Sequence, residues 1–169
     1  MEAFIKCPTC ASSDIKIETG THHFMESGLK NVSLLNVEKL ICNKCGEEIV
    51  SIPNPNQLMQ CIAEEIITSP APLTGPEIRF VRKNLHLKIV EFARLLGVAP
   101  GTVSRWENEH EWPTTPADRL IRFIYSRKAK VSESTLQKLD KFLEEEEHPS
   151  PPSNYVIPFP LEQAACANG

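Results

Sequence analysis

Apolar residues recur along this chain with two different spacings, and the change of spacing separates a β-rich N-terminal part from a helical remainder. Before residue 53, apolar and polar residues alternate in short runs such as Ile15-Lys16-Ile17, which is typical of half-buried strands. Further strands are predicted near residues 32–41 and 48–52. From Asn54 onward, apolar residues recur every three or four positions, as they do on one face of an α-helix.

Start signals place the helices more closely. Asn54, Pro55 and Gln57 predict a capped helix start, and Ser69-Pro70-Ala71-Pro72 predicts its end in a stiff linker. Further helices are predicted to begin at Thr74-x-x-Glu77, Thr115-Pro116-x-Asp118 and Ser134-x-x-Gln137. The side chains predicted to face the core of these later helices include Phe92, Leu95, Leu96, Leu120, Phe123 and Ile124.

The last part of the chain is rich in Pro and small residues and has no sustained periodicity, which predicts disorder. It contains one small apolar cluster that could dock on a partner or on the body of the protein: Tyr155, Val156, Ile157 and Phe159.

Charge is distributed unevenly along the chain. The formal net charge is −4 overall, but it is −4 over residues 1–72, +5 over residues 73–130 and −5 over residues 131–169. A polyanion such as DNA would bind the middle segment, because the basic side chains of that segment neutralise phosphates and so release their counterions. Apolar runs are too short to span a bilayer, and the N-terminus lacks the apolar core of a secretory signal, so we expect a cytoplasmic protein without membrane contact.

Two C-x-x-C pairs, Cys7/Cys10 and Cys42/Cys45, carry the first chemical signal. Tetrahedral Zn²⁺ needs four converging thiolates, and each C-x-x-C turn supplies two of them. Disulfides are disfavoured because nothing suggests secretion, and a redox C-x-x-C is disfavoured because no βαβ pattern surrounds either pair. Four cysteines leave no open coordination position, so we expect one structural zinc ion and no enzyme.

The remaining candidate ligands are assigned other roles. His22 and His23 are expected to be ordinary surface or core histidines. Cys61 is expected to be a buried apolar residue and Cys166 a free thiol without function.

The second signal lies in the basic segment, between Lys88 and Glu107. Gly97 suits the tight turn between two short helices, and Val98, Val103 and Trp106 would pack beneath it. The string Gly97-Val98-x-x-x-Thr102-Val103-Ser104-Arg105-Trp106-Glu107 resembles the lambda-repressor-like helix-turn-helix family. The resemblance implies that the second helix enters the major groove of double-stranded DNA, with Pro100, Gly101, Thr102, Ser104 and Arg105 facing the groove.

Two positions depart from that family, because Ile89 replaces a frequent phosphate-binding Gln and Ala99 replaces a capping Ser or Thr. Phosphate contacts are therefore expected from other bases, and those available are Lys88, Arg79, Arg82, Lys83, Arg119 and Arg122.

The order of the two motifs resembles the MqsA/YgiT antitoxin family. That resemblance implies a zinc domain that neutralises a small RNA-cleaving toxin. It also implies a C-terminal domain that forms a homodimer on the palindromic operator of its own operon. The acidity of residues 1–72 would suit a small basic toxin. The alternative function is a stand-alone zinc-ribbon/helix-turn-helix transcription factor with no toxin partner. A third possible function is an interaction adaptor or an enzyme.

The predicted architecture is α+β: a small β-rich zinc-ribbon domain, then an all-α helix-turn-helix domain of about five helices, then a disordered C-terminal tail. Its boundaries are residues 1–68 for the zinc ribbon with a trailing helix, 69–73 for the linker, 74–147 for the helical domain and 148–169 for the tail.

Overall fold

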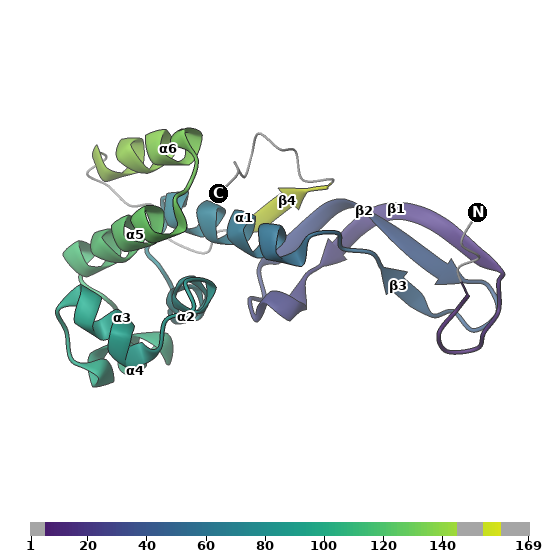
Figure 1. Ribbon diagram of the computed structural model, residues 1–169, viewed down its shortest axis with the longest axis horizontal. Coiled ribbons are helices and arrows are strands. Elements are labelled where there is room, and N and C mark those ends of the chain that lie inside the picture. Colours follow the sequence, from purple (N-terminus) through teal and green to yellow (C-terminus); the bar gives the residue numbers. More distant parts are fainter. Residues whose placement is uncertain (1–5, 145–153, 160–169) are drawn as a thin grey trace.

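The computed structural model of the protein describes residues 6–144 and 154–159. A small sheet occupies one end of the molecule and a group of helices the other (Figure 1). The elements in chain order are β1 (Ile15–His23), the 3-10 turn η1 (Met25–Ser27), β2 (Val32–Cys42), β3 (Glu48–Val50), α1 (Pro55–Thr68), α2 (Gly75–Asn84), α3 (Ile89–Leu96), α4 (Pro100–Glu107), α5 (Thr115–Ala129), α6 (Glu133–Glu144) and β4 (Tyr155–Pro158). The predicted α+β class is confirmed, and β1–β3 precede the helices as expected.

Strand β2 is the centre of the sheet. Along one edge it pairs antiparallel with β1, and the register shifts at a bulge between Gly20 and His22. Along the other edge it pairs antiparallel with β3 over Lys39–Ile41 and parallel with β4 over Val32–Leu35. The zinc-ligand candidate Cys42 therefore lies at one end of β2, and β4 lies beside the other end (Figure 1).

The prediction of a disordered tail is wrong for residues 154–159, because β4 is part of the sheet. The apolar cluster of the tail docks on the body of the protein, as one of the two expected alternatives. Tyr155, Ile157 and Phe159 are buried, whereas Val156 points outward. Such alternation is typical of a half-buried strand. In a short Pro-rich run, however, it does not predict a strand unless the strand that pairs with it is also known. The rest of the predicted tail, with Cys166, lies outside the described residues.

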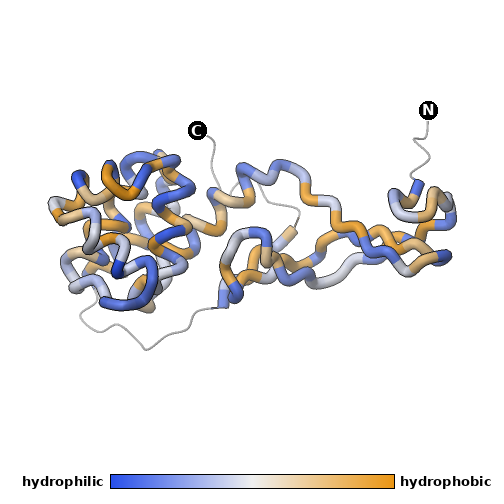
Figure 2. Tube along the Cα trace, turned by 90° about the horizontal axis from the view of Figure 1, so that it is seen from below, coloured by the Kyte–Doolittle hydropathy of each residue, from blue (hydrophilic) through white to orange (hydrophobic). Residues whose placement is uncertain are grey.

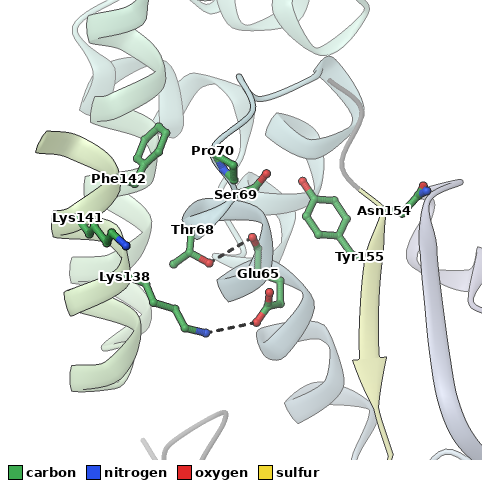
Figure 3. Close-up of a pocket in the computed structure, with 9 residues that line it drawn as sticks. All are labelled: Glu65, Thr68, Ser69, Pro70, Lys138, Lys141, Phe142, Asn154 and Tyr155. Atoms are coloured by element: carbon green, nitrogen blue, oxygen red, sulfur yellow. Dashed lines mark hydrogen bonds and ion pairs between the residues drawn. The ribbon is translucent and has the colours of Figure 1, made fainter. Parts of the chain in front are cut away.

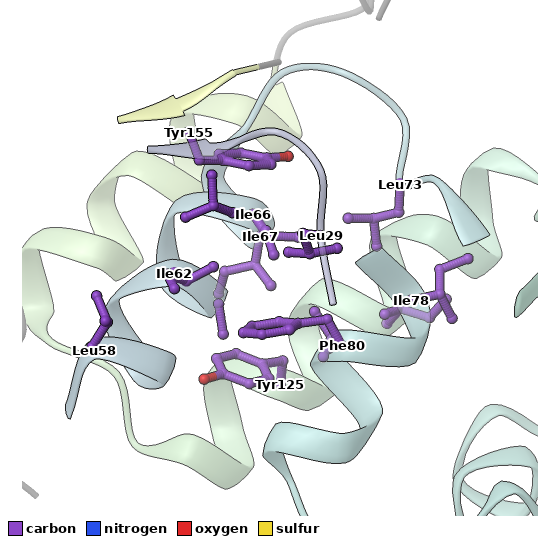
Figure 4. Packing of buried hydrophobic residues seen from close by; sticks show 14 of the residues in the cluster. Leu29, Leu58, Ile62, Ile66, Ile67, Leu73, Ile78, Phe80, Tyr125 and Tyr155 are labelled. Atoms are coloured by element: carbon purple, nitrogen blue, oxygen red, sulfur yellow. The ribbon is translucent and has the colours of Figure 1, made fainter. Parts of the chain in front are cut away.

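Helix α1 lies between the sheet and the other helices, and its apolar side chains join the two (Figure 1). Figure 4 shows Ile62, Ile66 and Ile67 of α1 surrounded by side chains from both sides, among them Leu29 near the sheet and Phe80 of α2. All five belong to one buried apolar cluster. The predicted start of α1 is confirmed, but Asn54 has a φ of 53° and makes no side-chain cap, so the expected capping box is absent.

The linker after α1 is fixed by Arg122, which is fully buried. Its guanidinium donates to the carbonyl oxygens of Ile67 at 2.8 Å, Ser69 at 2.7 Å and Ala71 at 2.6 Å. It also forms an ion pair with Asp118 at 2.6 Å. Its expected availability to phosphate is therefore wrong, because no part of the side chain reaches solvent.

Burial of Arg122 also explains which face of α5 turns inward. Ile121 and Tyr125 are fully buried beside it, whereas Leu120 and Phe123 are 37 % and 52 % exposed. The prediction that Leu120 and Phe123 face the core is therefore wrong. On α3 the prediction is right for Phe92 and Leu96 and wrong for Leu95, which is 42 % exposed.

The helix starts were predicted more accurately. The Thr74 backbone N–H donates to the Glu77 carboxylate at 2.8 Å, as the predicted capping box requires. At the start of α6 the capping hydroxyl belongs to Ser132, which accepts from the Thr135 N–H at 3.1 Å, two residues before the predicted position.

Figure 2 shows apolar stretches alternating with polar ones along both the strands and the helices. Among the described residues, the helices are too short or too polar to cross a membrane.

Candidate metal centre and nucleic-acid interface

The two C-x-x-C pairs form matching turns at the end of the sheet that is remote from the helices. In the first, the Ala11 N–H donates to the Cys7 carbonyl at 2.8 Å; in the second, the Gly46 N–H donates to the Cys42 carbonyl at 2.8 Å. Ala11 and Gly46 both have positive φ, 56° and 76°. The sequence indicates this conformation only for glycine, and the Ala11 turn adopts it with a residue that bears a Cβ.

Two hydrogen bonds connect the segments that carry the two turns, and the sulfur atoms lie close together. The Asn43 side chain donates to the Asp14 carboxylate at 2.8 Å, and the Asn43 N–H donates to the Asp14 carbonyl at 3.0 Å. The four predicted ligand sulfurs, from Cys7, Cys10, Cys42 and Cys45, lie within 4.8 Å of one another. The Cys7–Cys45 and Cys10–Cys42 sulfur distances are both 3.5 Å. A tetrahedral zinc site with Zn–S bonds of about 2.3 Å has S–S edges of about 3.8 Å, so the arrangement fits such an ion.

Electrostatics at the cluster also favour a cation. The Cys45 backbone N–H donates to the Cys42 sulfur and, against the effect of desolvation, lowers the Cys42 pKa to about 7. The Glu47 N–H acts on Cys45 in the same direction, but desolvation and the three neighbouring cysteines together raise the Cys45 pKa to about 12. Four thiolates this close together repel one another, and a bound divalent cation would remove that cost.

Neither histidine belongs to the cysteine cluster. His23 is hydrogen-bonded to the Ser33 hydroxyl at 3.0 Å, and the His22 ring nitrogen lies 3.9 Å from the Glu26 carboxylate. Cys61 is buried as expected, but it is disulfide-bonded and so is not a simple apolar residue.

Helices α3 and α4 form the predicted helix-turn-helix. Gly97 ends α3 with a φ of 68°, and the Val98 N–H donates back to the Ala93 carbonyl at 3.0 Å. Ala93 is fully buried, so the two helices can approach closely at this position. Val103 and Trp106 of α4 are buried beneath the turn. The remaining face of α4 is turned away from the core.

Glu107 fixes the C-terminal end of α4 to α2. Its buried carboxylate accepts two hydrogen bonds from Arg82, at 2.5 and 2.9 Å. Arg79 donates to the Glu107 carbonyl at 3.0 Å and to the Asn108 side chain at 2.7 Å. Gly75 permits this close approach, because a Cβ there would lie 2.5 Å from the Trp106 carbonyl oxygen. The sequence analysis did not predict the ion pair between Glu107 and Arg82. The only sequence signal for it is an acidic residue directly after Trp106.

The side chains predicted to face DNA lie on the free side of α4. Pro100, Gly101 and Arg105 are exposed, and Thr102 and Ser104 are partly exposed. Arg105 is held in place by two neighbours: its Nε lies 2.9 Å from the Glu111 carboxylate, and its guanidinium donates to the Thr102 hydroxyl at 3.2 Å. Sequence reasoning did not find Glu111, whose position after α4 gives no periodic signal.

The predicted phosphate contacts divide into two groups. Lys88 is exposed at the start of α3, and Arg79 is partly exposed, so both remain candidates. Arg82 is buried, and its guanidinium donates to Glu107 and to the Leu87 carbonyl at 2.8 Å. Its predicted contact with DNA is therefore not supported, because the ion pair that fixes α4 would have to break first.

Comparison with curated proteins finds relatives of the helix-turn-helix. A stretch of 53 residues is 40 % identical to the "Uncharacterized HTH-type transcriptional regulator YiaG" of Escherichia coli (strain K12), over 31 % of this chain and 55 % of that protein. The same protein from Escherichia coli O157:H7 gives the same values. The chain thus spans about half the length of the curated relatives it matches. No solved structure matches the chain.

A family model matches much more of the chain. It describes the antitoxin component of a bacterial toxin-antitoxin system, MqsA, and it covers residues 5–133, which is 129 of 169 residues. The match includes both cysteine turns and the helix-turn-helix, in the order that the sequence resemblance implied. The chain therefore belongs to the MqsA antitoxin family.

Proposed function

We propose that this protein is a sequence-specific DNA-binding regulator, the antitoxin of a toxin-antitoxin pair that represses its own operon. A homodimer would place its two α4 helices in successive major grooves of a palindromic operator, about 34–36 Å apart. Arg105 would contact a guanine edge or a phosphate, because its guanidinium can donate two parallel hydrogen bonds. Thr102 and Ser104 would donate to phosphates or base edges.

One observation carries this proposal: the two faces of α4 have opposite properties. Its inner face is held by buried Val103 and Trp106 and by the Glu107–Arg82 ion pair. Its outer face carries exposed or partly exposed polar side chains and one cation, Arg105. A helix held this firmly and left uncovered on its polar side suits insertion into a groove, since no reorganisation of the backbone is needed.

We assign the four cysteines a structural zinc ion. Zinc would hold the two turns together, with no open position for a substrate or a water molecule. The chemistry it supplies is neutralisation of the thiolates, and the Asn43–Asp14 cross-link then orients the two turns. The acidic N-terminal part would present a surface to a small basic toxin.

DNA binding is tested with the full-length protein and a labelled fragment from upstream of its own gene, against a shuffled fragment of equal composition. Arg105→Ala should weaken binding to the upstream fragment by about 1–3 kcal/mol, roughly 5- to 150-fold. Lys16→Ala in β1 removes one positive charge at the sheet and is the matched control. Equal affinity for the two fragments, or equal effects of the two substitutions, would contradict the proposal.

The toxin is tested separately, by native mass spectrometry of the tagged protein purified from its own operon. A zinc-bearing dimer with a small basic protein from the adjacent gene would support the antitoxin assignment. A zinc-bearing dimer alone, with operator binding intact, would favour the stand-alone transcription factor.

A further inference from the structure

The C-terminal segment, residues 154–159, joins the sheet by main-chain pairing. The Tyr155 N–H donates to the Asn31 carbonyl at 2.8 Å, and the Phe159 N–H donates to the Leu35 carbonyl at 2.9 Å. The pairing is parallel, with Val32 opposite Tyr155 and Leu35 opposite Pro158. The receiving edge, formed by residue 31 and the first four residues of β2 (residues 31–35 together), thus offers main-chain groups to an extended backbone. We call it the strand-accepting edge.

Alternate side chains give this edge selectivity. Tyr155, Ile157 and Phe159 point into the protein, and Val156 and Pro158 point outward. Figure 4 shows the Tyr155 ring lying over Ile66 of α1. The edge therefore accepts an aromatic, an aliphatic and a second aromatic side chain at every second position, as strand-addition sites do.

The first of these positions favours a side chain with a hydroxyl group. The Tyr155 hydroxyl donates to one oxygen of Glu77 at 2.8 Å, while the other Glu77 oxygen accepts from the Thr74 N–H that begins α2. Burial and the adjacent Glu77 charge raise the pKa of Tyr155 above its usual value, so the hydroxyl remains a proton donor. A buried carboxylate oxygen without this donor would be left without a partner at that position, which favours Tyr over Phe.

The segment lies outside the part of the chain that the family model matches. The family match ends at residue 133, where α6 begins, so β4 lies beyond it. The segment carries no charged residue, and it returns to β2 only after the whole helical part of the chain. Nothing in its pairing requires that it belong to the same chain as β2.

A cavity of about 430 Å³ lies between α1, α6 and the start of β4, lined by Glu65, Lys138, Phe142 and Tyr155 among others (Figure 3). The cavity leaves space for another chain beside the Tyr155 end of β4.

We propose that the strand-accepting edge is a binding site for extended, uncharged peptide segments with the pattern Tyr-x-aliphatic-x-aromatic, and that the C-terminal segment is its ligand within the chain. Because the segment is tethered, its effective concentration at the edge is on the order of millimolar. A segment of equal affinity from another protein must exceed that concentration to displace the C-terminal segment. The tail thus keeps the edge from pairing with unrelated strands.

The test uses full-length protein and a labelled synthetic peptide with the sequence of residues 154–159. Ile157→Asp places a charge in a buried position and should release the tail. Val156→Asp introduces the same charge on the exposed side of the same strand and is the matched control. Peptide binding is followed by fluorescence polarisation, and tail docking by hydrogen exchange of the Tyr155 and Phe159 amides.

The Ile157→Asp protein should bind the peptide at least tenfold more tightly than the wild-type protein or Val156→Asp, and its tail amides should exchange faster. Tyr155→Phe, which keeps the fold and removes only the hydroxyl, should raise peptide affinity several-fold. Equal peptide affinity in all four proteins would overturn the proposal, as would tail amides that exchange equally in the Ile157→Asp and Val156→Asp proteins. A peptide with Asp in place of its Ile should not bind. The outcome does not depend on DNA or toxin binding, so it is independent of the proposed function.

Discussion

Replacing Arg122 by Met should destabilise the protein strongly, although the substitution roughly preserves side-chain volume. The change leaves the buried Asp118 carboxylate with the Leu73 N–H as a donor, at 2.8 Å, but without its cation. It also removes the donors to three linker carbonyls, those of Ile67, Ser69 and Ala71. Breaking one side of a buried ion pair costs about 3–5 kcal/mol. For a chain of this length that corresponds to a fall in Tm of about 6–20 °C.

The assay is urea unfolding followed by circular dichroism, with Arg127→Met as the control on the exposed face of the same helix. The control should change the free energy of unfolding by less than about 0.5 kcal/mol. The sequence alone suggested instead that Arg122 contacts phosphate. In that case Arg122→Met would leave stability unchanged and reduce the salt dependence of DNA binding by about one phosphate. A loss of stability below about 1 kcal/mol would refute the structural reasoning.

Three further predictions concern helix α4, the metal and pH. Glu111→Gln frees Arg105 from an exposed ion pair worth about 0.2–1 kcal/mol, so operator affinity in a gel-shift titration should rise about 1.5- to 5-fold over that of Glu109→Gln; equal affinities would show that only net charge matters. Cys42→Ser should lower zinc content, measured by elemental mass spectrometry, well below one ion per chain while helical circular dichroism persists; a full zinc complement would exclude the cysteine site. Burial, with a contribution from the Glu64 charge, raises the folded-state pKa of Tyr125 above its unfolded value of about 10. The stability that the neutral Tyr125 hydroxyl contributes is therefore complete below pH 10 and falls as the pH rises above 10. In urea titrations at pH 8–11, Tyr125→Phe should lose less stability than the wild-type protein, and equal losses in the two proteins would contradict a raised Tyr125 pKa.

The sequence predicted those parts of the structure that depend on local chemistry. The cysteine turns need two thiolates at fixed spacing, and the turn at Gly97 needs positive φ. Both features can therefore be predicted from a few consecutive residues. The capping box at Thr74 is equally local, since its two partners are three residues apart.

What failed depends on residues far apart in the sequence. Leu120 and Phe123 looked apolar enough to face the core, but Arg122 takes that position because carbonyls more than 50 residues away need its donors. Arg82 looked like a free base until Glu107, 25 residues later, was placed against it. Strand β4 forms by pairing with the edge of β2, and the residues of the C-terminal segment alone do not indicate that pairing.

Strand β2 also limits how metal binding could influence helix α4. Its eleven residues span about 33 Å, with Cys42 at one end and the strand-accepting edge at the other. The Debye length at physiological ionic strength is about 8 Å, so the charge of a bound ion is screened several times over along that length. An effect of metal binding on the helices would therefore have to pass through the buried apolar cluster that β2 and α1 share, and not through the electric field of the ion.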